Sequence, residues 1–361
     1  MSKQRKLSYL FSILWVAILF AAIMGAVATG VINSYYSGIL VLIGINIILA
    51  VSLNLVTGFL GQLVLGHAGF MSVGAYSAAL FTMHAGLPIS VAFPLGLIFG
   101  GLVAAIFGVI IGVPALRLRG DYLAIITLGF GEIIRVLVLA VDFTGGAAGL
   151  TGIPYIEGKY TLIIYTFFIA FLTVVAILAF IRSRHGRAVI AIREDEIAAE
   201  ASGINTTYYK LLAFVVAAFF AGVAGGIYAH YIGVLDPSKF DFNYSVEILI
   251  MVVLGGMGSI TGSVCSATVL TLLPEMLRSF ADKRMLIYSL VLIIVMLFKP
   301  TGLLGTREFS VRKIVGKLFK GKKEGYRHAP GGRRAWKGGL KPWRRIERYW
   351  KPATSASPLA A

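Results

Sequence analysis

The chain has 361 residues, of which 58% are hydrophobic and only 14% are charged. A soluble globular domain has about 45–50% apolar and about 25% charged residues, so this composition excludes an ordinary soluble protein. The net charge of +17 is concentrated near one end, because residues 306–361 hold 16 Lys or Arg and 3 Asp or Glu, a net +13, which leaves +4 for residues 1–305.

The apolar stretches predict an all-α polytopic membrane protein with about 9–10 transmembrane or re-entrant helices, because several reach the roughly 20 residues that span a bilayer. The first stretch follows Lys3, Arg5 and Lys6 and is longer than a signal-peptide core, so we expect a first span that begins in the cytoplasm. The predicted spans are 8–29, 36–56, 67–84, 88–114, 122–141, 161–181, 210–233, 246–258, 260–279 and 285–299.

Small residues within these stretches predict close contacts between helices. The spacings Gly96-x3-Gly100 and Gly108-x3-Gly112 are typical of helix interfaces in membranes, because glycine lets two backbones approach each other. Cys265 is the only cysteine of the chain, which excludes an internal disulfide. Its apolar surroundings predict a small buried side chain.

Two glycine-rich breaks, at residues 58–69 and 255–262, interrupt the apolar pattern, one in each half. Broken helices near the middle of the bilayer are typical of transport sites, since unwound backbone groups can contact a polar substrate. Close helix packing is the alternative interpretation of both breaks, and a buried structural role is the alternative for the histidine. The candidate path residues at the breaks are Gly58, Gly61, Gln62, Gly66, His67, Gly255, Gly256 and Gly258.

Glu132 and Arg135 lie well inside the predicted fifth span. Charged side chains are costly there and usually face a bundle interior or a cavity. Their i, i+3 spacing lets the two side chains neutralise each other. We therefore include both as candidate path residues, and a mutual ion pair at a subunit interface is the alternative.

The distribution of positive charge predicts the orientation, because basic loops stay in the cytoplasm. Residues 117–121 and the loop with Arg182, Arg184, Arg187 and Arg193 are therefore expected in the cytoplasm, together with the basic tail. The weakly charged segments 142–160 and 234–245 are expected to face outward.

The cytoplasmic tail also constrains the stretch 246–279. A single crossing there would export the tail, whereas two short elements, or one crossing plus a re-entrant hairpin, return it to the cytoplasm, with the break at 255–262. This choice places Lys283 and Arg284 outside, a smaller violation than an exported tail.

Residues 182–209, the coupling loop, carry four positive and four negative side chains between two apolar runs. Acidic residues, alanines and a following glycine predict one short helix over 194–203. Ile197, Ala201 and Ile204 make a narrow apolar stripe, so we expect this helix to bind a groove of a partner; a solvated helix on the bilayer surface is the alternative. The residues assigned to the helix are Glu194, Asp195, Glu196, Ile197, Ala198, Ala199, Ala201 and Gly203.

The pattern Glu196-x-Ala198-Ala199-x3-Gly203 resembles the cytoplasmic coupling motif of permeases in ATP-binding-cassette (ABC) importers, with Ile197 as an extra residue after the glutamate. Further motifs resemble the LivM-type permeases of the high-affinity branched-chain amino acid importer, in the right order between residues 35 and 305. These motifs are SLNLVTG at 52–58, GQLVLGHAGF at 61–70, RLRGDYLAI at 117–125, TGGAAGLTGI at 144–153, GGMGS at 255–259 and KPTGLLG at 299–305.

The resemblance implies the ABC importer permease fold, with two inverted halves, in a multi-pass protein of the cell (inner) membrane. It implies a complex with a second, LivH-like permease subunit, two ABC ATPase subunits and an extracytoplasmic substrate-binding protein. The expected substrates are leucine, isoleucine and valine. A urea or short-chain amide permease of the same family is the alternative, followed by a stand-alone secondary carrier or channel.

We expect no catalytic site, metal or cofactor in this chain, so that ATP and Mg²⁺ are used by the partner subunits. The segment Gly316-x4-Gly321-Lys322-Lys323 lacks the hydroxyl residue that a P-loop uses for magnesium. The five histidines show no metal-ligand spacing.

The basic tail, residues 306–361, follows the predicted transmembrane domain, residues 1–305, and alternates Lys or Arg with aromatic residues. A basic segment next to a span is attracted to anionic lipid, which is the partner we expect for it. A contact with another protein is the alternative. No nucleic-acid partner is expected, because the tail contains no recognisable nucleic-acid-binding module.

Overall fold

The structure, a computed structural model, describes residues 34–118, 120–156 and 161–278, with isolated residues between 283 and 305. Within these residues the regular structure is helical, and five helices are long and apolar enough to cross a membrane, which confirms the predicted all-α membrane fold. The predicted first span and most of the last one lie outside the described residues, as does the basic tail.

Contacts divide the chain into residues 1–311 and 312–361, and every described residue belongs to the first unit. Its helices are α2 (Ser34–Asn54), α3 (His67–His84), α4 (Ile89–Ala115), α5 (Asp121–Ala140), α6 (Thr161–Arg182), α7 (Arg184–Glu194), α8 (Glu196–Ala201), α9 (Thr206–Ile232), α10 (Phe242–Gly255) and α11 (Ile260–Met276). The π-helix Leu55–Phe59 continues α2 directly. The long helices match the predicted spans to within a few residues at most ends.

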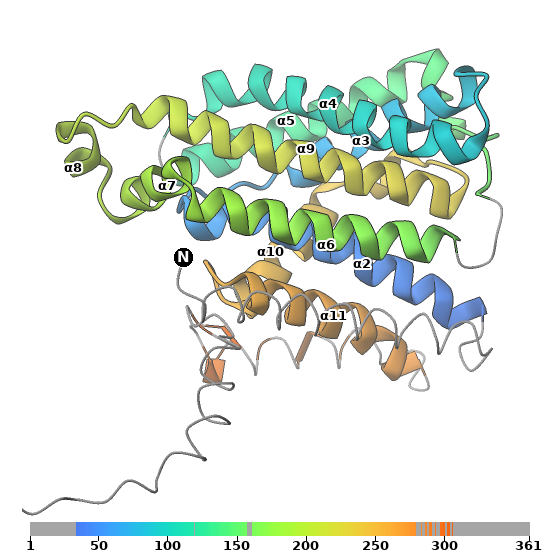
Figure 1. Cartoon of the computed structure of the whole chain (residues 1–361). Helices are drawn as coiled ribbons and strands as arrows, with labels where there is room; N and C mark the ends of the chain where they lie inside the picture. The colour runs from blue at the N-terminus through green and yellow to red at the C-terminus, as the bar shows by residue number, and fades with distance from the viewer. Residues whose placement is uncertain are drawn as a thin grey trace, which may run out of the picture. The chain divides into compact units, whose positions relative to one another are not determined.

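Helices α3, α4 and α9 pack against one another through glycines (Figure 1). Gly100 of α4 lies against the backbone of Gly74 in α3, and Gly108 of α4 lies against Ala218 in α9. An added Cβ at either α4 glycine would crowd these neighbours. The predicted close packing at the four-residue glycine spacings is therefore confirmed.

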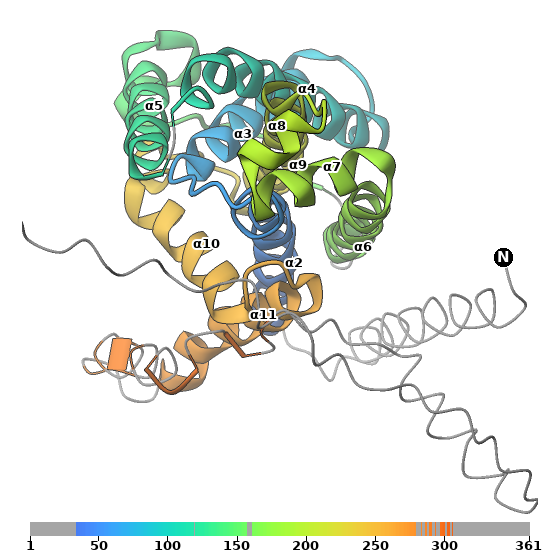
Figure 2. The ribbon, with the colours of Figure 1, turned by 90° about the vertical axis from the view of Figure 1, so that its left-hand side faces the viewer.

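Helix α2 lies at the centre of the described unit (Figure 2). It packs against α6, α9, α10 and α11, and 83% of its most apolar window is buried. Nearly every side chain of its second half is enclosed, including the polar residues Ser52 and Asn54. A polar side chain in such a position needs a partner from another element, because an unpaired buried polar group is costly.

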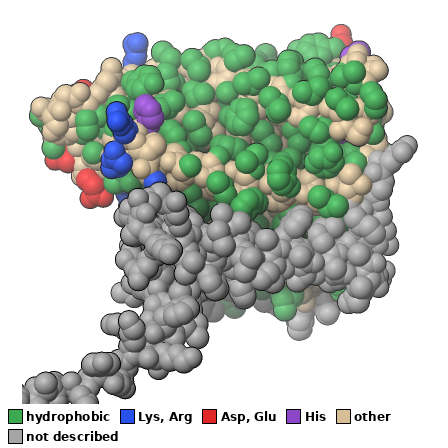
Figure 3. Space-filling model, viewed as in Figure 1, with side chains coloured by type: hydrophobic (Ala, Val, Ile, Leu, Met, Phe, Trp, Pro, Cys, Tyr) green, Lys and Arg blue, Asp and Glu red, His purple; other side chains and the backbone are tan. Residues whose placement is uncertain are grey.

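The outer helices present apolar side chains outward. Only 28% of the most apolar 18-residue stretch is buried in α5, and the same share is buried in α6. Isoleucine, leucine, valine and phenylalanine side chains cover the exposed faces of both helices. Figure 3 shows this apolar surface, with charged side chains gathered at the end where α7 and α8 lie. An outside of this kind suits a hydrocarbon environment rather than water.

The two ends of the helices differ in character. The coupling loop connects α6 with α9 at one end. Leu150 and Leu235 pair through two backbone hydrogen bonds of 2.9 and 3.0 Å, which joins the segments after α5 and after α9. Both segments follow the ends of their helices that lie away from the coupling loop, as predicted for two segments on the same side of the membrane.

The stretch 246–279 forms two helices, and the predicted break between them is confirmed. Helix α10 ends at Gly255 and α11 begins at Ile260, with positive φ values of 107° at Gly256 and 85° at Gly258 in between. The prediction for Cys265 is wrong, because its side chain is exposed on α11. In a membrane protein, apolar residues around a position indicate that it lies either in the protein interior or against lipid. The side chains that face lipid are exposed in a structure without a membrane.

Candidate functional site

The coupling loop contains two short helices where one was predicted over 194–203. Asp195 has an extended backbone, with φ at −157°, and separates α7 from α8. Its carboxylate accepts hydrogen bonds from the amides of Ile197 and Ala198, at 2.9 and 3.0 Å. The acidic run therefore caps a new helix at Asp195 instead of filling one first turn, and Glu194 ends the helix before it.

The predicted apolar stripe is shorter than expected. Ile197 is 71% exposed and Ala201 lies exposed one turn later on the same face of α8, whereas Ile204 lies beyond the helix and is half-buried. Ala199 points inward, at 5% exposure. Gly203 adopts the left-handed conformation predicted for a helix end, with φ at +83°. Ile197 and Ala201 therefore form an apolar surface that stays exposed among the described residues.

An ion pair fixes α8 to the bundle. Glu196 Oε2 lies 2.8 Å from Lys210 Nζ in the first turn of α9, where the lysine side chain is only 3% exposed. Asn205 caps α9 by accepting from the amide of Tyr208 at 3.1 Å. The caps at Asp195 and Asn205 and the Glu196–Lys210 pair thus attach α8 to the start of α9.

The two glycine-rich breaks meet, and the buried side chain of Asn54 joins them. Its Oδ1 accepts from the amide of Gly258 at 2.9 Å. Its Nδ2 donates to the carbonyl of Ser259 at 3.0 Å and to Ser263 Oγ at 2.9 Å. An added Cβ on Gly58 would overlap both Asn54 and the backbone of Gly258. Segments about 200 residues apart in the sequence therefore form one polar unit, termed here the break junction (residues 54–61 and 255–263).

The junction lies at the end of the bundle that carries the coupling loop. Arg193, near the end of α7, donates from Nη1 to the carbonyl of Gly58 at 2.5 Å. The two glycine-rich breaks therefore lie together beside the coupling loop, at one end of the described helices. The π-helix extends α2 by about another turn, which carries the break to the helix end before the chain turns back.

After Gly61 the chain turns back into the bundle and begins α3. His67 begins α3, is 2% exposed and lies 2.9 Å from Ser52 Oγ through Nε2. Gly66 packs against the backbone of Thr127 in α5, and Gln62 is half-buried. The buried position and the contact with Ser52 are compatible with the structural role given as the alternative for His67, and its role in a transport path stays a prediction.

Glu132 and Arg135 form the predicted ion pair on α5, with Nε and Oε2 2.7 Å apart. Their side chains are 32% and 28% exposed, so the pair lies at the surface of the described unit within a membrane-spanning helix. A charged pair at such a depth is stable only beside another protein surface or a polar path, because lipid offers it no partners.

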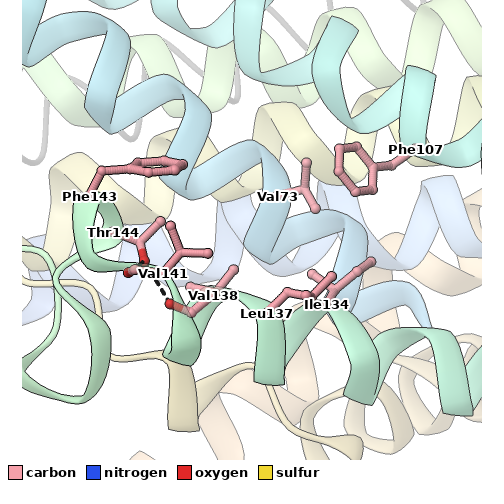
Figure 4. Close-up of a pocket in the computed structure, with 8 residues that line it drawn as sticks. All are labelled: Val73, Phe107, Ile134, Leu137, Val138, Val141, Phe143 and Thr144. Atoms are coloured by element: carbon pink, nitrogen blue, oxygen red, sulfur yellow. Dashed lines mark hydrogen bonds between the residues drawn. The ribbon is translucent and has the colours of Figure 1, made fainter.

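A cavity of about 160 Å³ lies between α3, α4 and α5 (Figure 4). It is lined by Val73, Phe107, Ile134, Leu137, Val138, Val141, Phe143 and Thr144. Its hydroxyl group, on Thr144, donates to the backbone carbonyls of Val138 and Val141. This lining suits an apolar side chain and offers nothing to the charged groups of an amino acid.

Among the described residues no group of three His, Cys, Asp or Glu side chains could hold a metal ion. The segment that partly resembles a P-loop, at residues 316–323, lies outside the described residues. The arrangement around Asn54 and Arg193 consists of backbone, amide and hydroxyl groups in contact with the charged coupling loop.

Three residues that hold this site together were not predicted. Asn54, Arg193 and Lys210 each act through a partner in another element. Two weak signals were present, since Asn54 and Lys210 are isolated polar residues at the ends of apolar runs. Buried polar residues in such runs need partners, but the sequence does not say which ones.

Comparison with known proteins shows a match over residues 35–299 to the family described as branched-chain amino acid transport system, permease component. The chain is 39% identical to the high-affinity branched-chain amino acid transport system permease protein LivM of Salmonella typhimurium over 291 residues, covering 72% of this chain and 68% of that protein. LivM of Escherichia coli K12 is 38% identical over the same shares. LivH of Escherichia coli K12 is 35% identical over 143 residues, covering 39% of this chain and 46% of LivH. No solved structure matches significantly.

Proposed function

Because the chain belongs to the family of branched-chain amino acid transport permease components, we propose that it is a membrane-spanning permease subunit of an ATP-driven importer for leucine, isoleucine and valine. The match over residues 35–299 carries this proposal, since it includes the break junction and the coupling loop. The names of the LivM relatives, high-affinity branched-chain amino acid permeases, favour branched-chain amino acids over urea or short-chain amides.

The subunit works within a complex. A second, LivH-like permease completes the pathway, two ABC ATPase subunits supply the energy, and an extracytoplasmic binding protein delivers the substrate. The similarity to both LivM and LivH supports a pair of related permeases. ATP and Mg²⁺ are bound by the ATPase subunits, and the chain itself is not an enzyme.

The coupling loop is the surface on which the ATPase docks. Ile197 and Ala201 on α8 are exposed apolar residues, surrounded by acidic and basic side chains, at the end of the bundle that is charged. An apolar face on a short helix is a common anchor for a groove of a partner. This loop, the N-terminus and the basic tail lie in the cytoplasm, and the tail binds anionic lipid.

Glu132, Arg135 and the break-junction residues belong to the transport path. The ion pair lies on the exposed face of α5, where the second permease subunit or the path itself covers it. The glycines of the junction close the path at the end near the ATPase. Opening requires the backbones of Gly58 and Gly258 to separate, since they are in close contact in this conformation.

The experiment reconstitutes the permease pair, the ATPase subunits and the binding protein in proteoliposomes and measures ATP-dependent leucine uptake. The variant Ile197→Asp places a charge on the proposed docking face. We expect the ATPase subunits to stop co-purifying and uptake to be lost, because a buried unpaired charge opposes assembly.

The matched control is Tyr155→Asp, an equally exposed apolar position at 78% exposure in the segment at the opposite end of α6. This variant should assemble and retain the ATPase. Normal assembly and uptake with Ile197→Asp would exclude α8 as the docking surface. Absence of ATP-dependent uptake by the unmodified complex would reject the importer assignment.

A further inference from the structure

Arg193 connects three parts of the molecule that are distant in sequence. Its backbone belongs to α7, two residues before the cap that starts α8. Its side chain crosses to the π-helix that ends α2, and it reaches the turn between α10 and α11. The coupling loop, the first break and the second break therefore share one side chain.

The contacts of Arg193 with the breaks are close. The guanidinium donates to the carbonyl of Gly58 at 2.5 Å. An added Cβ on Gly61 would lie 3.0 Å from Arg193 Cγ, and one on Gly258 would lie 2.8 Å from Arg193 Nη1. Both glycines have positive φ, +77° and +85°, so their backbones turn where the arginine passes. The space beside the arginine is closed on both sides by backbone.

The carbonyl that Arg193 binds is one that a helix leaves without a partner. The last carbonyl groups of a helix have no amide to accept from, and Gly58 lies in the last turn before the chain leaves the π-helix. A charged donor makes a stronger hydrogen bond than a neutral one. No acidic side chain among the described residues forms an ion pair with Arg193, so this carbonyl is its recorded partner.

Through Asn54 the contact extends to both halves of the chain. Asn54 lies one turn before Gly58 on α2 and holds Gly258 and Ser259 in the second break. A displacement of Arg193 thus acts on Gly58 directly. It acts on Gly258 both directly and through Asn54. The coupling loop itself is anchored to α9 by the Glu196–Lys210 pair, so the arginine moves with that loop.

We infer that Arg193 is a positioning residue that transmits movement of the coupling loop to the break junction and so links ATP hydrolysis to opening of the path. This inference rests on the proposed importer function. It adds a residue outside the acidic-alanine motif, on the helix that precedes it. Without the arginine, the ATPase still docks on α8 and hydrolyses ATP, but the junction no longer follows the loop.

The test compares Arg193→Ala with Arg184→Ala in the reconstituted complex. Arg184 is the matched control, because it is an exposed arginine at the other end of the same helix and contacts neither break. Leucine uptake and ATP hydrolysis are measured in the same vesicles. For Arg193→Ala we expect complete complexes, hydrolysis comparable to the unmodified complex, and leucine moved per ATP reduced by about 10-fold, within the usual range of coupling between sites.

Arg193→Lys is the second variant. Lysine keeps the charge but lacks the planar fork that reaches Gly58 and Gly258 together, so uptake per ATP should fall less than with alanine. If Arg193→Ala does not assemble, the lysine variant decides: a reduced uptake per ATP supports the inference, and an unchanged ratio overturns it.

Three results overturn the inference while leaving the importer function intact. They are an unchanged uptake per ATP in Arg193→Ala, an equal loss in Arg184→Ala, and a parallel loss of hydrolysis and uptake, which would indicate a structural role alone. A failure of the unmodified complex to import leucine is a different outcome, because it contradicts the proposed function itself.

Discussion

Asn54 shows how one buried amide can hold two segments of a membrane protein together. It has no exposed surface and forms hydrogen bonds with three residues of the break junction, Gly258, Ser259 and Ser263. Removal leaves the half-buried amide of Gly258 without its recorded partner, whereas the carbonyl of Ser259 still accepts from the amide and the hydroxyl of Ser263. A buried polar group left without a partner costs about 1–3 kcal/mol. Asn54 is therefore expected to contribute more to stability than to any direct contact with substrate.

We predict that Asn54→Ala lowers the unfolding temperature of the protein in detergent and weakens the contact between α2 and α11. The control is Asn46→Ala, which removes one 2.9 Å hydrogen bond from the half-buried Asn46 to Thr271 between the same two helices. Thermal unfolding measures both variants. An effect of Asn54→Ala no larger than that of Asn46→Ala would contradict the role of Asn54 at the junction.

The Glu132–Arg135 pair leads to a second prediction. Replacing one partner leaves a single charge within a span, at a cost of roughly 2.5–3.5 kcal/mol on insertion scales. Glu132→Gln and Arg135→Gln should each reduce the amount of folded protein in the membrane, and the double variant should recover part of the loss. Quantitative immunoblotting of membranes checks this, and a double variant worse than both single variants would show that the charges do not compensate each other.

At the residue scale, the sequence predicted which positions were unusual but not their partners. Glu132 and Arg135 could be paired in advance because helical geometry brings i and i+3 together. Arg193 and Gly58 are 135 residues apart, and no local rule places one beside the other. His67 illustrates the same limit, since its burial depends on Ser52 in another helix.

At the element scale, an ion pair and the buried Ala199 attach α8 to the bundle. Lys210 is almost fully buried and its carboxylate partner is Glu196. Removing one member of a buried pair costs about 3–5 kcal/mol, because the remaining charge stays without compensation. We expect the loss of this pair to displace α8 and therefore to weaken docking of the ATPase.

We predict that Glu196→Lys or Lys210→Glu alone prevents stable docking of the ATPase subunits, and that the exchanged pair Glu196→Lys with Lys210→Glu restores part of it. Co-purification of the ATPase with the permease measures the result. Both single variants alter the loop, and only the exchange restores the ion pair. If the exchanged pair does not restore docking, the ATPase contacts the Glu196 carboxylate itself.

Element boundaries in the spans were predictable because apolar length is a strong signal. The break between α10 and α11 was equally clear from its glycines. The helix split at Asp195 was not, since a run of acidic residues is compatible both with a first turn and with a cap. The π-helix after α2 was also not predicted, and it extends the helix to Phe59, into the first glycine-rich break.

At the scale of the whole molecule, the arrangement predicts which surfaces lie on the same side of the membrane. The coupling loop and the turn between α4 and α5 share one end, because Gly112 of α4 packs against Leu211 and Phe214 near the start of α9. The paired segments at Leu150 and Leu235 share the other end. The charge rule places the first end in the cytoplasm.

This orientation can be tested with the cysteine chemistry of the chain. Cys265→Ser removes the only cysteine, and Tyr155→Cys or Ser202→Cys then adds one at an exposed position at either end. In intact cells a membrane-impermeant maleimide should label Tyr155→Cys, whereas Ser202→Cys should react only after permeabilisation. The reverse pattern would invert the topology.

The glycine contacts of α9 have a mechanical consequence. The backbone of Gly222 in α9 contacts the backbone of Gly74 in α3. No side chains separate the helices at this contact, and α4 packs against both. Helix α9 starts directly after the coupling loop and its 27 residues extend about 40 Å, the thickness of the membrane. We therefore expect α9 to move as a rigid rod, so that a displacement of the coupling loop by a partner also displaces the segment beside Leu235.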